Sequence, residues 1–298
     1  MRKLLFLVNP NAGHRRINKS LVEVIGVFNE AGYEVTVFLT TGPGSGVRIL
    51  ADRAADYDLI VCAGGDGTLN ETISGLLQSG ADRPIGYIPC GSTNDFAITL
   101  KLSMDVVQAA RDIVQGEAEY YDVGRWAERY FSYIASFGAF TRVSYTTPQS
   151  LKNTLGHLAY LLSGITEIPQ IRKIPIRMEI DGETVEGEYI FGAVSNSTSV
   201  GGIFTLSPKL VDLQDGKFEV ILVRFPKDPM ELAAFVTAIQ SGTYDCAAIT
   251  LRSASRLTVY QNPDMDWTLD GERAEGKDVI CIENLKRAVR LIRRREGA

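Results

Sequence analysis

The chain has 298 residues, of which 45% are hydrophobic and 22% are charged, and its formal net charge is -5. This length predicts about two domains, because one domain usually holds roughly 100–200 residues. The acidic balance argues against a general nucleic-acid-binding protein, since such proteins carry a strong basic excess.

No run of roughly 18 apolar residues occurs, so no transmembrane helix is expected. The start, MRKLLFLVNP, has the basic onset of a signal peptide, but its apolar run is too short and ends at Asn9-Pro10. The cysteines show no metal-ligand or redox spacing, which favours buried thiols in a reducing cytosol. They are Cys62, Cys90, Cys246 and Cys281. We therefore predict a cytoplasmic protein.

Strand-like and helix-like patterns alternate along residues 1–122. Three short apolar runs and one alternating segment, Tyr33–Leu39, predict strands, and apolar residues at helical spacing predict a helix after each of the first three strands. The predicted strands are Lys3–Val8, Tyr33–Leu39, Leu59–Ala63 and Ile85–Pro89. This alternation predicts an α/β domain with a doubly wound, mostly parallel sheet and helices on both faces.

The pattern changes after Asp122. Strand-like runs divided by Gly, Asp, Asn or Pro predict a mainly antiparallel β-sandwich domain over residues 123–285. Two segments look helical, Asn153–Ile165 and Pro229–Gln240. The stretch YYDVGR is interpreted as the linker between the domains, and residues 286–298 as a separate basic C-terminal element.

Three small, polar, glycine-containing turns follow predicted strands: Asn9–Gly13, GGDGT (Gly64–Thr68) and Pro89–Ala97. Ligands of doubly wound sheets bind at the carboxyl ends of strands, where glycines allow close approach and helix N-termini suit phosphate. A carboxylate repels phosphate, so we expect Asp66 to face a metal ion or a hydroxyl. The alternative is a turn with a capping residue. Neither a P-loop nor a Rossmann fingerprint is present.

Five motifs occur in order between Asn9 and Glu272: NPNAG, GGDGTLNE, PCGSTNDFA, VDLQDGKFEV and LDGE. By these five motifs and their order, the chain resembles the diacylglycerol kinase catalytic-domain family, and more closely its soluble bacterial lipid kinase branch. The resemblance implies ATP-dependent phosphorylation of a lipid hydroxyl. It also implies that ATP binds to the first domain, that the second faces the lipid, and that the cleft between them holds the reaction.

Carried over residue by residue, the resemblance implies a set of nucleotide contacts. They are Asn9, Pro10, Asn11, Ala12, Gly13, Thr41, Gly64, Gly65, Asp66, Gly67, Thr68, Leu69, Asn70 and Thr93. Thr40 precedes Thr41, and either could align. Asp66 and Glu272 are the expected catalytic residues, with Glu272 as the general base that takes the hydroxyl proton. Asp-Gly in LDGE also signals a hairpin, and a tight turn is compatible with a base.

VDLQDGKF resembles the metal site of the family, which usually has two adjacent aspartates; here one of them is Gln214. The resemblance implies Mg²⁺ at Asp215, helped by backbone carbonyls near Asp212 and Lys217. Asp122 takes the place of a family aspartate that supports this network. Alternatively, it is a charged residue at a domain junction.

The expected partner is a lipid substrate at the membrane surface, with peripheral membrane contact and no nucleic acid. The segment Leu151–Ile165 has one apolar helical face, which suits either core packing or a lipid-facing lid. The tail residues Lys286, Arg287, Arg290, Arg293, Arg294 and Arg295 could contact anionic lipid or form a solvated final element. A homodimer is left open.

Two other functions are carried as alternatives. An NAD kinase-like enzyme shares GGDGT, but GSTNDFA and LDGE argue against it. A catalytically silent nucleotide- or lipid-binding sensor would fit the departure at Gln214. The sequence does not name the lipid, since diacylglycerol and related lipids all offer a hydroxyl and apolar pockets tolerate changes of the tail.

Overall fold

The computed structural model describes residues 1–92, 94–138, 172–200 and 204–294. The chain forms two compact units, residues 1–123 with 285–298, and residues 124–284. It leaves the first unit within strand β5 (Glu117–Trp126) and returns within strand β18 (Val279–Arg293). The predicted linker YYDVGR therefore lies inside a strand and is not a loop.

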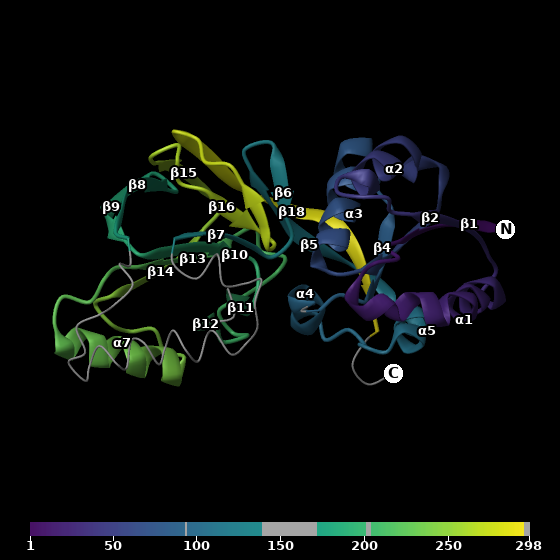
Figure 1. The fold of residues 1–298 in the computed structure, drawn as a ribbon, viewed down its shortest axis with the longest axis horizontal. Coiled ribbons are helices and arrows are strands. Elements are labelled where there is room, and N and C mark those ends of the chain that lie inside the picture. The colour runs from purple at the N-terminus through teal and green to yellow at the C-terminus, as the bar shows by residue number, and fades with distance from the viewer. Residues whose placement is uncertain (93, 139–171, 201–203, 295–298) are drawn as a thin grey trace. The chain divides into compact units, whose positions relative to one another are not determined.

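A parallel sheet forms the centre of the first unit (Figure 1). Its strands are β1 (Arg2–Val8), β2 (Tyr33–Leu39), β3 (Leu59–Gly64) and β4 (Pro84–Pro89). The strand order is β2-β1-β3-β4, followed by β18, which runs parallel to β4. All four strands predicted for this domain are present. β1, β3 and β4 are mostly buried apolar runs, whereas β2 alternates in sequence and is only partly buried at the end of the strand order.

Helices cover both faces of this sheet (Figure 1). They are α1 (Arg16–Glu30), α2 (Ser45–Arg53), α3 (Asp66–Ser79), α4 (Asp95–Thr99) and α5 (Val106–Gln115), with 3₁₀ turns at Gly13–Arg15 and Ala54–Asp56. Helices α2 and α3 pack together, as do α1 and α5. The fold class predicted for the first domain is confirmed.

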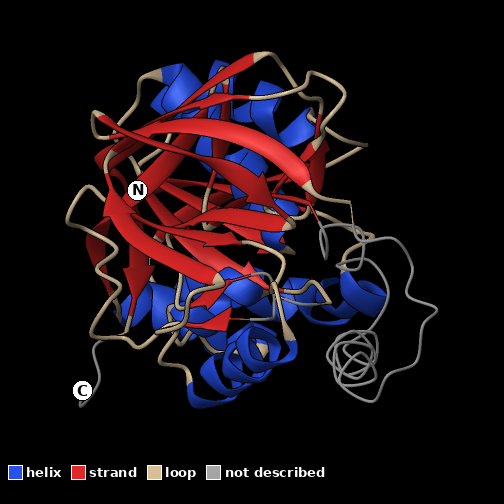
Figure 2. Ribbon diagram, turned by 90° about the vertical axis from the view of Figure 1, so that its left-hand side faces the viewer, coloured by secondary structure: helices blue, strands red, loops and turns tan. Residues whose placement is uncertain are grey.

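The second unit is made mostly of antiparallel strands (Figure 2). They are β6 (Arg129–Phe131), β7 (Ile134–Gly138), β8 (Ile174–Ile180), β9 (Glu183–Tyr189), β10 (Phe191–Ser195), β11 (Ser199–Val200), β12 (Phe204–Thr205), β13 (Phe218–Val223), β14 (Ile249–Ala254), β15 (Arg256–Tyr260), β16 (Trp267–Leu269) and β17 (Glu272–Ala274). One sheet has the order β14-β13-β10-β7-β16-β17. The strands β18, β15, β8 and β9 pair antiparallel with one another in that order and form a second layer.

Aromatic side chains fill the space between these two layers. Trp267 is 1% exposed, and its ring lies 4.9 Å from that of Phe137 and 6.2 Å from that of Trp126. Met178 and Leu257, from the layer of β8 and β15, belong to the same core. The predicted antiparallel β-sandwich is thereby confirmed.

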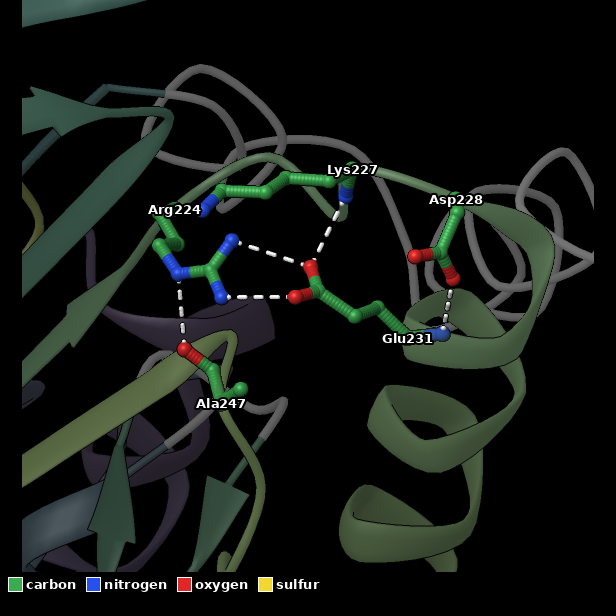
Figure 3. A network of polar contacts seen from close by, with 5 residues as sticks. All are labelled: Arg224, Lys227, Asp228, Glu231 and Ala247. Atoms are coloured by element: carbon green, nitrogen blue, oxygen red, sulfur yellow. Dashed lines mark hydrogen bonds and ion pairs between the residues drawn. The ribbon is translucent and has the colours of Figure 1, made fainter.

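Helix α7 (Pro229–Ser241) matches the predicted helix Pro229–Gln240. Its first turn is held by a polar network (Figure 3). The Asp228 carboxylate accepts the Glu231 N–H at 2.8 Å, and the Glu231 carboxylate accepts two hydrogen bonds from Arg224 at 2.9 Å each. Arg224 also donates to the Ala247 carbonyl at 2.7 Å. The other predicted helix, Asn153–Ile165, lies outside the described residues.

The basic C-terminal element is not a separate element. Its residues up to Arg293 belong to β18, where Val289 and Leu291 are buried. Arg290 pairs with Asp82 at 2.8 Å, and Arg293 with Glu119 at 2.8 Å. The apolar residues between the arginines form a strand of the core, so this part of the tail is not a free basic segment.

Two of the four cysteines are deeply buried. Burial raises the pKa of Cys62 to about 12 and that of Cys90 to about 11. Cys246 and Cys281 are half-buried, and all four are free thiols. In the part of the chain that the structure describes, no helix is long and apolar enough to cross a bilayer.

Two helical glycines provide a matched test of the packing of the first unit. A Cβ on Gly75 in α3 would lie 2.6 Å from the Val47 carbonyl oxygen, whereas a Cβ on Gly26 in α1 would have nothing within 4 Å. We expect Gly75→Ala to lower the free energy of unfolding by about 1–3 kcal/mol through overpacking. Gly26→Ala should raise it by about 0.5–1 kcal/mol. Urea unfolding checks both, and equal effects would contradict the packing.

The contact between Glu231 and Arg224 predicts a pH dependence of stability. The hydrogen bonds from Arg224, and then that from the Lys227 N–H, lower the pKa of Glu231 from 4.5 to about 2. As the pH falls, the unfolded chain therefore takes up this proton first, and the stabilisation is lost between about pH 4.5 and 2. The difference in unfolding free energy between wild type and Glu231→Gln should shrink over that range in urea titrations. A difference independent of pH would contradict the assignment.

Candidate functional site

The turns after β1, β3 and β4 lie next to one another at the carboxyl edge of the first sheet. The Asn9 N–H donates to the Ala63 carbonyl at 2.9 Å, and the Cys90 N–H donates to the Gly64 carbonyl at 2.7 Å. Helix α3 begins at Asp66, directly after the middle turn. The structure therefore brings together the three glycine-containing turns that the sequence singled out.

Glycine is needed in these turns because they touch one another. A Cβ on Gly13 would lie 1.9 Å from the Cys90 carbonyl oxygen, and the φ of Gly13 is +37°. A Cβ on Gly91 would lie 2.5 Å from the Gly65 Cα. Real Cβ atoms essentially never come closer than 3.0 Å to such atoms. The glycines thus allow the turns to pack together, whether or not a ligand is bound.

The first of these turns is anchored to α3 by a side chain. The Asn9 amide donates to the Thr68 hydroxyl at 3.2 Å, and its carbonyl oxygen accepts the Asn11 N–H at 3.0 Å. The Ala12 N–H donates to the Asn9 backbone carbonyl at 3.3 Å. Asn9 therefore fixes both the shape of its own turn and its distance from the helix.

The remaining predicted nucleotide residues around α3 differ in accessibility. Leu69 is fully buried, so its side chain belongs to the core and only its backbone could reach a ligand. The side-chain oxygen Oδ1 of Asn70 accepts a hydrogen bond from the Ser74 hydroxyl at 3.4 Å. Gly67 lies in the first turn of α3. Thr93 lies outside the described residues.

Asp66 joins α3 to the turn after β4. Its carboxylate accepts the Asp95 N–H at 3.1 Å and the Phe96 N–H at 3.4 Å, at the start of α4. These bonds give Asp66 a capping role, which was the alternative to a metal or a hydroxyl contact. A carboxylate has more lone pairs than these two bonds use, so the expected contact with a metal or hydroxyl stays a prediction.

Glu71, the last residue of GGDGTLNE, was not assigned a role from the sequence. Its two carboxylate oxygens accept the Gly44 N–H at 2.6 Å and the Gly46 N–H at 2.8 Å, at the start of α2. The same turn contains Thr41, whose N–H donates to the Ser45 hydroxyl at 3.2 Å. Glu71 thus ties to α3 the segment in which Thr40 or Thr41 is expected to contact nucleotide.

Asn94 was also missed. It has a φ of 54° and is 4% exposed. Its side chain accepts the Gly91 N–H at 2.9 Å and donates to the Gly91 carbonyl at 3.0 Å. The Tyr87 hydroxyl donates to the Gly64 carbonyl at 3.3 Å, and burial, followed by the charge of Asp66, raises the pKa of Tyr87. The signal was present in STND, because asparagine tolerates positive φ.

The motif LDGE forms the hairpin that its Asp-Gly pair predicts. Asp270 and Gly271 have φ values of 48° and 88°, as a two-residue turn between β16 and β17 requires. The Asp270 carboxylate is buried and accepts backbone N–H groups from Ser132, Tyr133 and Ile134. The turn is therefore anchored to the segment that precedes β7.

The proposed base stands at the exposed end of this hairpin. The side chain of Glu272 is 56% exposed, and its Oε2 lies 3.6 Å from Nη2 of Arg129. Arg129 also donates to the Arg273 carbonyl at 2.8 Å. The carboxylate is thus accessible to solvent and lies beside a cation.

The residues expected to hold Mg²⁺ lie in a tight loop before β13. The Asp212 carboxylate accepts the Gln214 N–H at 2.9 Å, and the Asp215 carboxylate accepts the Lys217 N–H at 2.8 Å. Nearby, burial and then the charges of Asp215 and Asp212 raise the pKa of Glu219 to about 8. Among the described residues, no three His, Cys, Asp or Glu side chains are grouped to hold a metal. The carboxylate and carbonyl oxygens of this loop are nevertheless the type of ligand that a hard cation such as Mg²⁺ prefers, and the local charge is negative.

Asp122 is 1% exposed and lies in β5. Its carboxylate accepts the Arg287 N–H at 2.7 Å, at a point of β18 where Arg287 has a φ of 52°. The side chain thus fixes an irregular position in the last strand. Its expected support of a metal network stays a prediction.

Comparison with known proteins identifies the family. Residues 3–126 match the profile of the diacylglycerol kinase catalytic domain, and residues 134–293 match that of the YegS C-terminal NAD kinase beta sandwich-like domain. The chain belongs to the diacylglycerol kinase catalytic-domain family, as its five motifs suggest. It is thus a member of a lipid kinase family of transferases.

Curated relatives agree over nearly the whole chain. A diacylglycerol kinase of Bacillus subtilis is 33% identical over 274 residues, which are 91% of this chain and 90% of the relative. One of Staphylococcus aureus is 31% identical over 97% of this chain and 92% of the relative. A crystal structure of a diacylglycerol kinase from Bacillus anthracis has a TM-score of 0.75 at 21% identity, covering 100% of this chain and 98% of that one. At that identity the structural match shows the fold alone.

The contacts of Glu71 predict its effect on stability. Glu71→Gln keeps the shape but can accept only one of the two glycine N–H groups, and its amide NH₂ would face the other. We expect the free energy of unfolding to fall by about 1.5–3 kcal/mol, the usual range for hydrogen bonds to a charged group. Glu34→Gln, at an exposed position of β2, is the control. Equal urea midpoints for the two variants would contradict the role of Glu71.

Proposed function

We propose that the chain is an ATP- and Mg²⁺-dependent lipid kinase that transfers the γ-phosphate to a hydroxyl of diacylglycerol or a related lipid. The observation that carries the proposal is the packing of three glycine-containing turns around the first turn of α3. Relatives of nearly the same length that are named diacylglycerol kinases support the choice of substrate class.

The first unit would bind the nucleotide phosphates. The N-terminus of α3 carries a partial positive charge, and the turns beside it bring backbone N–H groups close to it without intervening side chains. Asn9 holds the turn after β1 beside α3, and Glu71 holds the start of α2 beside the same helix. Asp66 is held in a fixed orientation by the start of α4. Such preorganisation is the main contribution that a protein makes to phosphoryl transfer.

Asp212, Asp215 and the Lys217 carbonyl would hold the magnesium ion. The ion, when bound, supplies positive charge that balances nearby carboxylates or phosphates. Gly216 has a φ of 86°, which lets this loop turn sharply between Asp215 and Lys217. Since Gln214 replaces a family aspartate, we expect weaker cation binding than in a site with both acids.

Glu272 would accept the proton of the lipid hydroxyl as the hydroxyl oxygen forms a bond to the γ-phosphorus of ATP and the bond from that phosphorus to the leaving ADP breaks. A general base must come within hydrogen-bond reach of that proton, and the exposed position of Glu272 leaves it accessible. The lipid substrate would be met at the membrane surface by peripheral contact. A homodimer is compatible with the proposal but is not required by it.

The proposal is tested by the transfer of labelled γ-phosphate from ATP. Wild-type protein is incubated with Mg²⁺ and a panel of detergent-dispersed lipids, with NAD in a parallel tube. We expect label in one lipid product and its loss when EDTA is added. Label in NADP would instead support the NAD kinase-like alternative, and ATP binding without label in any product would support a sensor.

The role of Glu272 is tested by Glu272→Gln. The amide keeps the size of the side chain but cannot take a proton at neutral pH, so we expect transfer to fall by about 10²–10⁴-fold while ATP binding is unchanged. Glu275→Gln, at an exposed position in the segment after β17, is the control. Near-normal turnover of Glu272→Gln would exclude Glu272 as the base.

A further inference from the structure

We propose that Arg129 is a positioning residue that holds Glu272 in the orientation needed to accept the hydroxyl proton. This inference rests on the proposed function, because it presumes that Glu272 is the base. It concerns residues of the second unit alone: Arg129 lies on β6, and Glu272 begins β17.

Hydrogen bonds of Asp270 hold the backbone of the hairpin that carries Glu272. At the turn itself, Asp270 is 5% exposed and its carboxylate accepts the N–H groups of Tyr133 and Ile134 at 3.0 Å each. The Asp270 N–H in turn donates to the Ile134 carbonyl at 2.9 Å. These bonds fix the backbone of the turn, and none of them is made by the Glu272 side chain.

Arg129 provides the second anchor. Its Nη1 donates to the Arg273 carbonyl at 2.8 Å, while its Nη2 lies 3.6 Å from Oε2 of Glu272. One planar guanidinium thus contacts the backbone of β17 and the carboxylate beside it. The backbone bond fixes the guanidinium, and the fixed guanidinium limits the rotation of the carboxylate.

The length of the contact suits a base. At 3.6 Å the pair is an ion pair rather than a hydrogen bond, so it attracts the carboxylate without using its lone pairs in a short bond. An adjacent cation also favours the ionised form of a carboxyl group. Arg273, the other cation next to Glu272, is directed elsewhere, since its Nε bonds to Asp266 at 2.7 Å. Arg129 is thus a cation of this hairpin that faces the Glu272 carboxylate.

Both anchors of the hairpin come from one short segment. Asp270 is bound by the backbone of residues 132–134, and Glu272 is contacted by Arg129, three residues before that segment. A base carried on an exposed turn would otherwise have several rotamers open to it. Loss of about 1 Å in placement is enough to lower the rate by about 10²-fold.

The test compares Arg129→Met and Arg129→Lys with wild type in the lipid kinase assay. Arg129→Met should lower kcat by about 10–100-fold, leave the KM for ATP unchanged, and move the acidic limb of the kcat–pH profile to higher pH. Arg129→Lys keeps the charge but not the fork, so it should restore the acidic limb and only part of kcat.

Arg125→Met is the matched control. Arg125 is a neighbouring exposed arginine of β5 that pairs with Glu283, away from the LDGE turn, so its loss should leave kcat and the pH profile unchanged. Thermal unfolding of each variant shows whether it is folded. A folded Arg129→Met with normal kcat would overturn the positioning role. So would a folded Arg129→Met with a lower kcat whose acidic limb stays at the wild-type pH, if Arg129→Lys leaves that limb unchanged as well.

Glu272→Gln in the same assay separates this inference from the proposed function. An inactive Glu272→Gln together with a normal Arg129→Met rejects the positioning role and keeps the base. A fully active Glu272→Gln rejects the base, and with it the role of Arg129. Absence of transfer to any lipid by the wild type rejects the proposed function itself.

Discussion

The first unit depends on one steric constraint: three strand-end turns must approach within van der Waals contact of one another and of the first turn of α3. Only glycine satisfies this at positions 13 and 91, where a Cβ would lie 1.9 Å from the Cys90 carbonyl oxygen or 2.5 Å from the Gly65 Cα. At position 65 a Cβ would lie 3.2 Å from the Gly91 Cα, which is a tight contact. Hydrogen bonds of Asn9 and Asp66 then join the turns after β1 and β4 to α3, and those of Glu71 join the start of α2 to the same helix. This edge of the sheet is thus held in place by its own packing.

The same device recurs in the second unit, with a different partner. Asp270 is a buried carboxylate that accepts several backbone N–H groups, as Glu71 does in the first unit. In each case the carboxylate of an acidic motif residue accepts hydrogen bonds from backbone N–H groups of a segment that is distant in the chain. A motif of this kind therefore contains two sorts of residue, those that can meet a ligand and those that hold the first sort in place.

The sequence predicted the parallel strands and the hairpin at LDGE, because apolar runs and Asp-Gly turns are local signals. It did not predict the partners of Asp66 and Glu71, which lie 29 and 27 residues away at the starts of other helices. The two units divide within YYDVGR, as predicted, but the sequence did not show that this stretch and the basic tail belong to strands. The basic residues of the tail suggested a solvated element, whereas Arg290 and Arg293 of β18 pair with Asp82 and Glu119 from elsewhere in the first unit.

The return of the chain to the first unit through β18 has a consequence for the order of folding. This strand lies parallel to β4, and its Ile292 packs against the core formed by β1, β3, α1 and α5. The sheet of the first unit is therefore incomplete until β18 has been synthesised. During translation the first unit cannot complete this sheet before the strands of the second unit that precede β18 have been made.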